Sequence, residues 1–301
     1  MREWRRCPVR GHDTLLLSEP LEPRPAELPP GPCPFCPPRD ELTPLVITRR
    51  DGVTVVPNGR PWQRVEDAHR VLAPAPLARW EAPGAHEVLV EGPDHRPAWR
   101  RVGLLAASLS VARERMRDLR QDQRLRDLVW YRQHGVAAGA RLPHPHSVLL
   151  ALGTDPRWTE PGCASCDALS RELRGGERIV AENDRAVALA PFAPMGDGEL
   201  WVLPRAHLGS LEAAAEAVVA DLGALLEQVL CAMDVALGAP ASTIVLRSGH
   251  RVEEAHLRFV VRPLLRVPDG FDALGRHRVH LTPEVLAKAL RQARHIGVTP
   301  D

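Results

Sequence analysis

The chain has 301 residues, and 39 lysines and arginines against 38 aspartates and glutamates give it a formal net charge of +1. Its 44% hydrophobic and 26% charged residues are ordinary for a globular protein, which excludes global disorder. The near-neutral balance argues against binding nucleic acid through a bulk positive field. Length alone predicts one large domain or two of about 150 residues.

No targeting or membrane segment is visible in the sequence. The basic start, MREWRRCPVRGHD, lacks the apolar run of a signal peptide. The most apolar helical stretch, residues 211–237, carries acidic residues throughout and is not expected to span a bilayer. We therefore expect a cytoplasmic protein without membrane contact, whose six cysteines act as ligands, nucleophiles or buried hydrophobes and not as disulfides.

In chain order, the first half begins with a proline-rich, irregular stretch at residues 20–38. β-Branched and alternating residues then predict strands at 53–57, 86–91, 127–132 and 147–152. Apolar residues at helical spacing predict a helix over residues 99–121, between the second and third of these strands. Residues 153–162 are the expected connector to the second half.

The second half repeats this order. Strands are expected at residues 178–181, 186–190, 200–203, 243–247 and 257–261, with a helix over residues 211–237. A last helix opens at Thr282-Pro283-Glu284, with a cap, a proline at the first position and an acidic first turn. The repeat predicts an α+β protein built from two antiparallel units, residues 1–155 and 156–301.

Four of the cysteines form two CxxC pairs, Cys33–Cys36 and Cys163–Cys166. Chance would give roughly 0.1 such pairs in this composition. A thioredoxin-type redox pair needs a strand before it and a helix after it, and the proline-rich GPCPFCPP starts a helix poorly. We therefore interpret each pair as half of a tetrahedral zinc site that needs two further ligands.

Histidines at repeated spacing supply the missing ligands. His95 and His144 are 49 residues apart, and so are His207 and His256. Each half therefore contains a Cys-x-x-Cys…His…His set, which favours two zinc ions per chain.

His144-Pro145-His146 is the expected chemical centre. The segment follows the small residues of GVAAGARLP and precedes a strand, where residues i and i+2 face the same side. If His144 is held by the metal, His146 lies beside it uncoordinated, and a neutral imidazole is a competent nucleophile. In the alternative reading, both histidines are metal ligands or surface residues.

These residues carry a resemblance to a known family. CPFCPPRDELTP, VVPNGRP, HEVLVEGPDH, AGARLPHPHS, CASCDAL, APFAPMGDGELWVLPRAH and GFDAL resemble the galactose-1-phosphate uridylyltransferase branch of the histidine-triad superfamily. The two CxxC pairs are most similar to the two-zinc subgroup that includes plant ADP-glucose phosphorylase. The resemblance implies a tandem duplication of two histidine-triad-like units, each an antiparallel sheet with a packed helix.

The resemblance also implies a mechanism. His146 matches the family nucleophile, which takes a nucleotide from a nucleoside-diphosphate sugar, releases a sugar 1-phosphate and passes the nucleotide to a second phosphate. The implied activity is that of a UDP-glucose:hexose-1-phosphate uridylyltransferase of galactose metabolism. Two sets of residues match zinc ligands: Cys33, Cys36, His95 and His144, and then Cys163, Cys166, His207 and His256.

The implied substrate contacts partly depart from the family pattern. Asn58 matches a nucleotide-pocket asparagine, Arg24 an arginine near the phosphates, and Asp272 an acidic residue at the sugar hydroxyls. Ser147 is also expected to contact the substrate. Val148 replaces the family glutamine that donates a hydrogen bond to a phosphoryl oxygen. Two further replacements are expected in the same phosphate pocket: Gln133 replaces an asparagine, and Arg141 replaces a small residue. Arg141 either supplies the charge that Val148 cannot or is a solvated surface residue.

Three functions remain open at this point. The leading one is a zinc-containing nucleotidyltransferase. A phosphorylase or hydrolase of nucleoside-diphosphate sugars or dinucleoside polyphosphates is the second, and a catalytically silent, nucleotide-binding zinc scaffold is the third. The family also implies a homodimer. The base, the sugar and the final acceptor are left undecided by the sequence.

Overall fold

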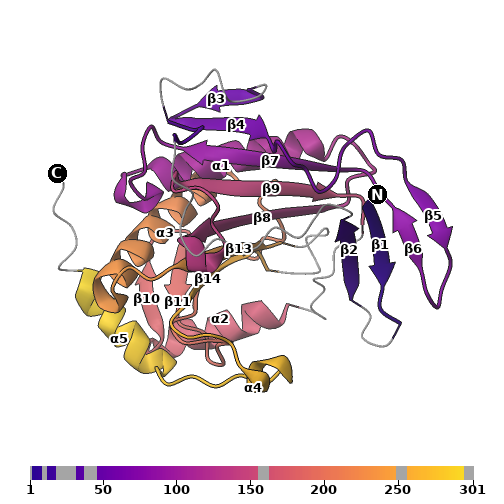
Figure 1. Ribbon diagram of the computed structural model, residues 1–301. Helices are drawn as coiled ribbons and strands as arrows, with labels where there is room; N and C mark the ends of the chain where they lie inside the picture. The colour runs from indigo at the N-terminus through magenta and orange to yellow at the C-terminus, as the bar shows by residue number, and fades with distance from the viewer. Residues whose placement is uncertain are drawn as a thin grey trace.

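The computed structural model describes residues 2–8, 12–17, 32–36, 46–154, 163–248 and 256–294. Its centre is one ten-stranded sheet in the order β10-β11-β12-β14-β13-β8-β9-β7-β4-β3 (Figure 1). The first half of the chain supplies β3 (Thr48–Arg50), β4 (Val53–Pro57), β7 (Gly84–Glu91), β8 (Asp127–His134) and β9 (His146–Leu152). The second half supplies β10 (Ile179–Glu182), β11 (Ala186–Leu189), β12 (Leu200–Pro204), β13 (Ser242–Arg247) and β14 (Arg258–Pro263).

The two halves join edge to edge at a single strand pair. β8 and β13 run antiparallel, with Tyr131 opposite Val245 and Gln133 opposite Thr243. All the other neighbours in this sheet are also antiparallel, as expected for the α+β class. The expected unit boundary between residues 155 and 156 lies outside the described residues and stays a prediction.

Alternation along the strands separates two faces of the sheet. Leu149 on β9, Trp130 on β8 and Ile244 on β13 are buried in the main hydrophobic core. Their sequence neighbours point to the opposite face, which holds His146, Val148, Tyr131, Gln133 and Thr243 because cross-strand partners share a face. We call this second side the His146 face.

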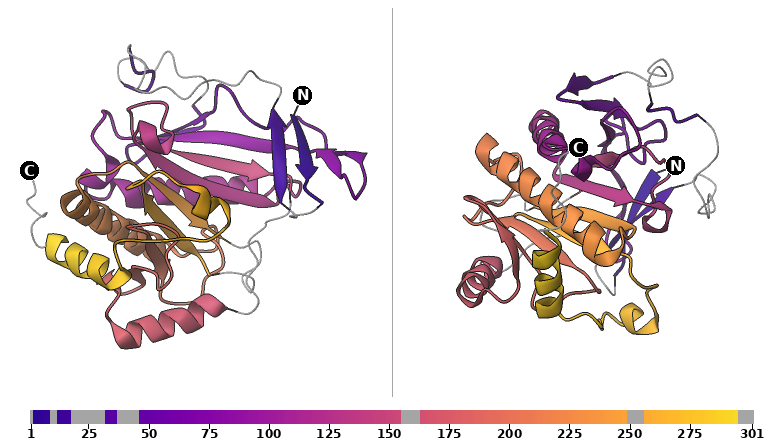
Figure 2. Two further views of the ribbon diagram at one scale, coloured as in Figure 1. Left: turned by 60° about the horizontal axis from the view of Figure 1, so that its bottom comes forward. Right: turned by 90° about the vertical axis from the view of Figure 1, so that its left-hand side faces the viewer.

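Helices cover the core face. They are α1 (Leu104–Leu119), α3 (Glu216–Leu237) and α5 (Pro283–Arg294), and all three contribute leucines to the main core. Figure 2 shows α1 and α3 lying against each other across the two halves. On the His146 face, α2 (Ala164–Gly175) packs Leu169 against Val187 and Leu189 of the outer strand β11.

The α1–α3 contact joins the halves a second time. A Cβ on Gly223 of α3 would lie 2.4 Å from the Cα of Ala106, so the helix backbones touch at this point. Four residues further on, the Glu227 carboxylate accepts hydrogen bonds from the backbone N–H groups of Gly103 (3.0 Å) and Leu105 (2.8 Å). Glu227 thereby caps the N-terminus of α1 from the neighbouring helix.

A small second sheet was not anticipated from the sequence. It has the order β2-β1-β6-β5, formed by β1 (Arg2–Arg6), β2 (Asp13–Leu17), β5 (Arg70–Ala73) and β6 (Arg79–Glu81). Trp4 and Trp80 stack across it with ring centroids 6.5 Å apart. Its strands are short, and the β1–β6 pair, which joins its two hairpins, links Trp4 to Trp80, 76 residues away, so local patterning gives little signal for this sheet.

The expected helices need three corrections. The helix expected over residues 99–121 is interrupted: a 3₁₀ turn (Ala98–Arg100) precedes Gly103, whose φ of +80° lies in the left-handed region, and α1 starts after it. The helix expected over residues 211–237 starts only at Glu216. Helix α2 was missed because it starts within a CxxC pair that was read only as metal ligands: Cys163 is its N-cap residue and Cys166 lies in its first turn. Within the described residues no helix is both long and apolar enough to cross a membrane.

Candidate active site and metal clusters

Cys33, Cys36, His95 and His144 come together as the spacing predicted. Their ligand atoms all lie within 4.8 Å of one another. The Sγ of Cys36 is 3.2 Å from His95 Nε2 and 3.4 Å from His144 Nδ1. Three segments far apart in the sequence therefore converge on one point beside the start of β9.

A hydrogen bond to the backbone fixes the orientation of the His144 ring. Its Nε2 lies 2.9 Å from the backbone oxygen of Gly92. A carbonyl can only accept, so Nε2 carries the proton and Nδ1 presents its lone pair to the two cysteines. This is the arrangement a metal-binding imidazole needs, with the tautomer set by the hydrogen bond on its far side.

The second cluster repeats this geometry. The ligand atoms of Cys163, Cys166, His207 and His256 also lie within 4.8 Å of one another. His256 Nδ1 is 3.3 Å from Cys166 Sγ, while its Nε2 is 2.9 Å from the backbone oxygen of Pro204. His144 with Gly92 and His256 with Pro204 are thus equivalent in the two halves. Each cluster offers two thiolates and two imidazoles, a set that can close around one metal ion.

His146 is the first residue of β9, two residues after the buried His144. Its Nδ1 lies 2.8 Å from the backbone oxygen of His144, so Nδ1 carries the proton and Nε2 keeps a lone pair. Burial lowers the pKa of His146, which favours the neutral imidazole. The ring of Phe35, from between the two cysteines of the first cluster, lies 6.2 Å from the His146 ring. His146 therefore presents an unprotonated ring nitrogen, Nε2, beside the first Cys/His cluster.

A buried ion pair lies behind this segment on the core face. Arg132 of β8 is paired with Glu91 of β7, and both side chains are almost wholly buried. Glu91 also accepts from Ser108 Oγ (2.7 Å), and its backbone N–H donates to the Pro145 oxygen (2.9 Å). The strands that flank β9 are thereby tied together directly behind His146. Both charges occupy core-facing positions of their strands, but β7 and β8 carry other polar residues on that face, so the sequence did not single out this pair.

Asn58 lies at one end of the His146 face. Its Oδ1 accepts from the Arg60 N–H (2.9 Å) and its Nδ2 lies 2.8 Å from Nε2 of His86. Burial lowers the pKa of His86 to about 4, so this histidine is neutral and its role in holding Asn58 was not foreseen. An apolar wall on the same face consists of Phe35, Val56, Val88 and Val90.

Gln133 and Arg141 surround the position next to His146. Gln133 shares the His146 face, but its Nε2 donates to the Ala138 oxygen at 2.6 Å, across the turn that follows β8. Arg141 is exposed, and its charge acts on the pKa of Tyr131, which places it near that side chain.

The structure does not bring Ser147 to the same side. Its side chain is fully buried on the core face, where its hydroxyl has no hydrogen-bond partner among the described residues. A one-residue step along β9 reverses the side-chain direction, so Ser147 points away from His146. The expectation that its side chain contacts substrate is corrected accordingly. Arg24 lies outside the described residues.

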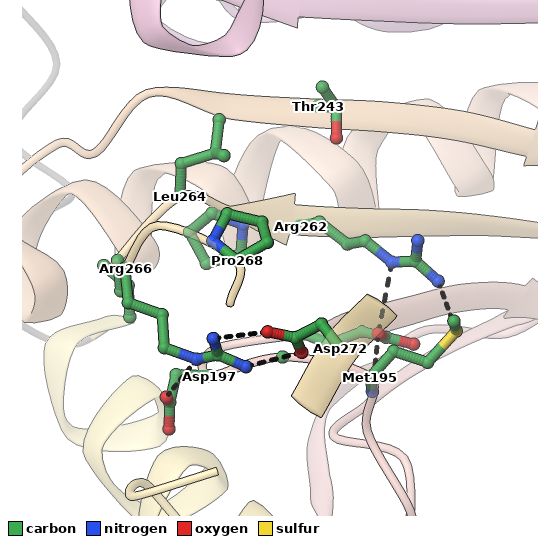
Figure 3. A pocket seen from close by; sticks show the side chains of 12 residues that line it. Met195, Asp197, Thr243, Arg262, Leu264, Arg266, Pro268 and Asp272 are labelled. Atoms are coloured by element: carbon green, nitrogen blue, oxygen red, sulfur yellow. Dashed lines mark hydrogen bonds and ion pairs between the residues drawn. The ribbon is translucent and has the colours of Figure 1, made fainter. Parts of the chain in front are cut away.

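Asp272 lines a separate cavity of about 160 Å³ at the second-half end of the His146 face (Figure 3). It lies on the short helix α4 (Gly270–Ala273), and both of its oxygens accept from Arg266 at 2.7 Å. This ion pair holds the pKa of Asp272 well below its usual range. Thr243 and Arg262 also line the cavity. Thr243 of β13 is two strands from β9 and Arg262 of β14 is three, so the cavity lies about 10–14 Å across the sheet from His146.

Comparison with known proteins gives a consistent picture. No protein-family model matches the sequence. An ADP-glucose phosphorylase from Arabidopsis thaliana is 25% identical over 231 residues, which cover 69% of this chain and 64% of that protein. A galactose-1-phosphate uridylyltransferase from Thermotoga maritima is 30% identical over 151 residues, which cover 45% of this chain and 47% of that protein. The matched segment thus spans less than two thirds of either relative.

The likeness in fold extends over nearly the whole chain. A solved uridylyltransferase structure superimposes with a TM-score of 0.82 at 24% identity, covering 99% of this chain and all of the other. The relatives and structural neighbours are therefore galactose-1-phosphate uridylyltransferases and proteins like them, which confirms the resemblance drawn from the motifs. The α+β fold with an antiparallel sheet is confirmed, and the chain shares it with this uridylyltransferase.

Proposed function

We propose that this chain is a nucleotidyltransferase that carries a nucleotide on His146. The observation that carries the proposal is the hydrogen bond from His146 Nδ1 to the His144 oxygen, 2.8 Å long, which leaves Nε2 unprotonated. An imidazole nitrogen held in this way is ready to attack phosphorus without first losing a proton. The names of the sequence relatives, a phosphorylase of ADP-glucose and a uridylyltransferase, agree with such chemistry.

In the proposed reaction, Nε2 of His146 attacks the α-phosphorus of a nucleoside-diphosphate sugar. The bond between that phosphorus and the bridging oxygen breaks, and the sugar 1-phosphate leaves with the electron pair. A phosphate oxygen of the acceptor then attacks the nucleotidyl-histidine, and the Nε2–phosphorus bond breaks to restore His146. The hydrogen bond at Nδ1 stabilises the positive charge that the ring carries while it is substituted.

The two Cys/His clusters are proposed to hold one zinc ion each. Bond lengths near 2.3 Å to sulfur and 2.1 Å to nitrogen give sulfur–nitrogen separations of about 3.6 Å in a tetrahedron. The contacts of Cys36 with His95 and His144, at 3.2 and 3.4 Å, are close to that value. Two thiolates with two imidazoles favour zinc over harder metals. All four positions of each cluster come from protein, so the metal would be structural and would fix the segment that bears His146.

Substrate contacts are proposed along the His146 face. The apolar wall of Phe35, Val56, Val88 and Val90 suits a nucleobase, with Asn58 at its edge. Gln133 and Arg141 lie where the phosphates would be, and the guanidinium of Arg141 supplies positive charge there. Asp272 and its cavity of about 160 Å³ are proposed to bind the sugar.

A phosphorylase is the second candidate. It is favoured by the name of the Arabidopsis relative, which aligns with 69% of this chain. The two activities share the covalent step and differ only in the acceptor, which is a sugar 1-phosphate for a transferase and inorganic phosphate for a phosphorylase. A silent scaffold remains the third candidate because Val148 donates no hydrogen bond to a phosphoryl group.

The test is intact-protein mass spectrometry after mixing the metal-loaded chain with UDP-glucose or ADP-glucose at neutral pH, since phosphoramidates hydrolyse in acid. We expect a mass increase of one UMP or AMP that is absent in His146→Ala and present in His69→Ala, a matched change at an exposed histidine. Adding galactose 1-phosphate, or inorganic phosphate, to the labelled chain then identifies the acceptor by its product. Nucleotide binding and full metal content without any label would favour the scaffold. The expected homodimer is tested by the mass of the particle in solution.

A further inference from the structure

On β9, the described residues of the His146 face offer no side-chain hydrogen-bond donor beside His146, where a phosphoryl group bound to it would lie. The next residue along β9 on this face is Val148, which is almost fully buried and whose side chain has no polar atom. Ser147 between them points to the core. A phosphoryl group undergoing transfer develops charge on its non-bridging oxygens, and a reaction without a donor to them loses a large share of its rate.

Tyr131 is the only tyrosine in the sequence, and it lies directly opposite Val148 on the neighbouring strand. Directly opposed residues share a face, so the Tyr131 side chain is on the His146 face. His146 is two positions along β9 from Val148, which makes Tyr131 its diagonal cross-strand neighbour. Diagonal neighbours are about 7–8 Å apart at the backbone, within reach of an aromatic side chain.

The Tyr131 hydroxyl is available as a donor. It has no hydrogen-bond partner among the described residues, and its side chain is half-buried. Burial raises the pKa of Tyr131 to about 12, so the hydroxyl keeps its proton throughout the neutral range. The positive charge of Arg141 acts on the same group in the opposite sense. A protonated hydroxyl beside a guanidinium suits an anionic ligand.

Other donors on this face are less suitable. The Gln133 amide is already bonded to the Ala138 oxygen at 2.6 Å, and that bond fixes the turn after β8. The Asn58 amide is held by His86 on the far side of Val88 and Val90. Arg141 is exposed, and its positive charge acts on Tyr131 itself.

We propose that Tyr131 is a catalytic residue whose hydroxyl donates a hydrogen bond to a non-bridging oxygen of the phosphoryl group transferred to His146, the role that Val148 cannot fill. The inference rests on the proposed nucleotidyl transfer. Tyr131 transfers no proton in this role: its O–H bond stays intact while the phosphorus–oxygen bond of the donor breaks and the bond to Nε2 forms.

The test measures the single-turnover rate at which UDP-glucose or ADP-glucose, whichever labels the wild type, forms the adduct. Tyr131→Phe removes only the hydroxyl and is expected to slow this step about 100-fold, the typical effect of losing one such donor. Affinity for the donor and the thermal unfolding temperature should change little. Val148→Gln placed in the Tyr131→Phe background is expected to restore much of the rate, since it puts an amide donor on the same face.

A second measurement stays informative if the double variant folds poorly. Replacing one non-bridging α-oxygen of the donor by sulfur gives two diastereomers, and sulfur accepts a hydrogen bond weakly. We expect wild type to discriminate between the two and Tyr131→Phe to lose most of that discrimination.

The possible failures are distinguishable. If wild type is labelled and Tyr131→Phe is labelled at the same rate, the role of Tyr131 is wrong and the proposed function stands. If wild type binds nucleotide with full metal content but is never labelled, the proposed function fails and the inference with it.

Discussion

Replacing Gly223 with alanine tests whether the contact between α1 and α3 stabilises the protein as the structure indicates. The new Cβ would lie 2.4 Å from the Cα, 2.7 Å from the Cβ and 2.7 Å from the N of Ala106. These are backbone or backbone-attached atoms of another helix, so no side chain can rotate to make room. The helices would have to move apart by about 1 Å to restore ordinary carbon–carbon contacts.

Two effects of opposite sign decide the magnitude. Alanine is intrinsically better than glycine inside a helix by about 1 kcal/mol. Overpacking a tightly packed interior costs about 1–3 kcal/mol, and separating α1 from α3 also strains the bonds from Glu227 to the first turn of α1. We therefore expect a net loss of up to about 2 kcal/mol in the free energy of unfolding.

Gly175→Ala is the matched control. Gly175 is the last residue of α2, and a Cβ there would meet nothing within 4 Å. The same substitution in the same kind of element should leave stability unchanged or raise it by up to about 1 kcal/mol. Equilibrium unfolding in urea with the metal sites filled compares the two. Equal stability of the two variants would refute the packing argument.

Three further predictions concern the site. Cys33→Ser and Cys163→Ser should each remove one metal ion per chain, as measured by elemental analysis. Only Cys33→Ser should slow the labelling of His146, by about 10–100-fold, because only the first cluster holds the segment before β9. Equal effects of the two variants on labelling would contradict this assignment. Because burial lowers the pKa of His86 to about 4, the unfolded chain binds a proton that the folded chain does not as the pH falls from about 6.5 to 4. His86→Gln should therefore show a shallower loss of unfolding free energy over that window, by about 3 kcal/mol at most, and parallel pH curves would refute it. Arg141→Ala should sharply reduce the rate of nucleotidyl transfer, and unchanged kinetics would return Arg141 to the role of a solvated surface residue.

Much of the candidate site could be read from the sequence because its signals are local or repeated. CxxC spacing points two thiols at one ion, and the repeated interval of 49 residues between histidines identified the remaining ligands in both halves. The His144-Pro145-His146 segment indicated that one histidine would be held and the other presented, and the hydrogen bond at Nδ1 of His146 agrees with that reading. The strand at 53–57 was predicted with the bounds it has in the structure.

Long-range pairing accounts for what the sequence left open. Nothing in the local pattern says that β8 pairs with β13, and that pair merges two expected sheets into one and aligns Gln133 with Thr243. The face to which Ser147 points depends on the register of β9, because a single residue step exchanges the two faces. Tyr131 was passed over for the same reason, since only the pairing of β8 with β9 puts it opposite Val148.

The sequence by itself determined which residues could bind metal or act as a nucleophile, because these properties depend on residue type and on spacing along the chain. Periodicities of 2.0 and 3.6 residues likewise located most strands and helices. Only the tertiary structure decided which side chains share a face, that Glu91 and Arg132 pair behind His146, and that Gly223 meets Ala106. Such contacts join segments far apart in sequence, where the energy depends on register and packing that no local pattern specifies.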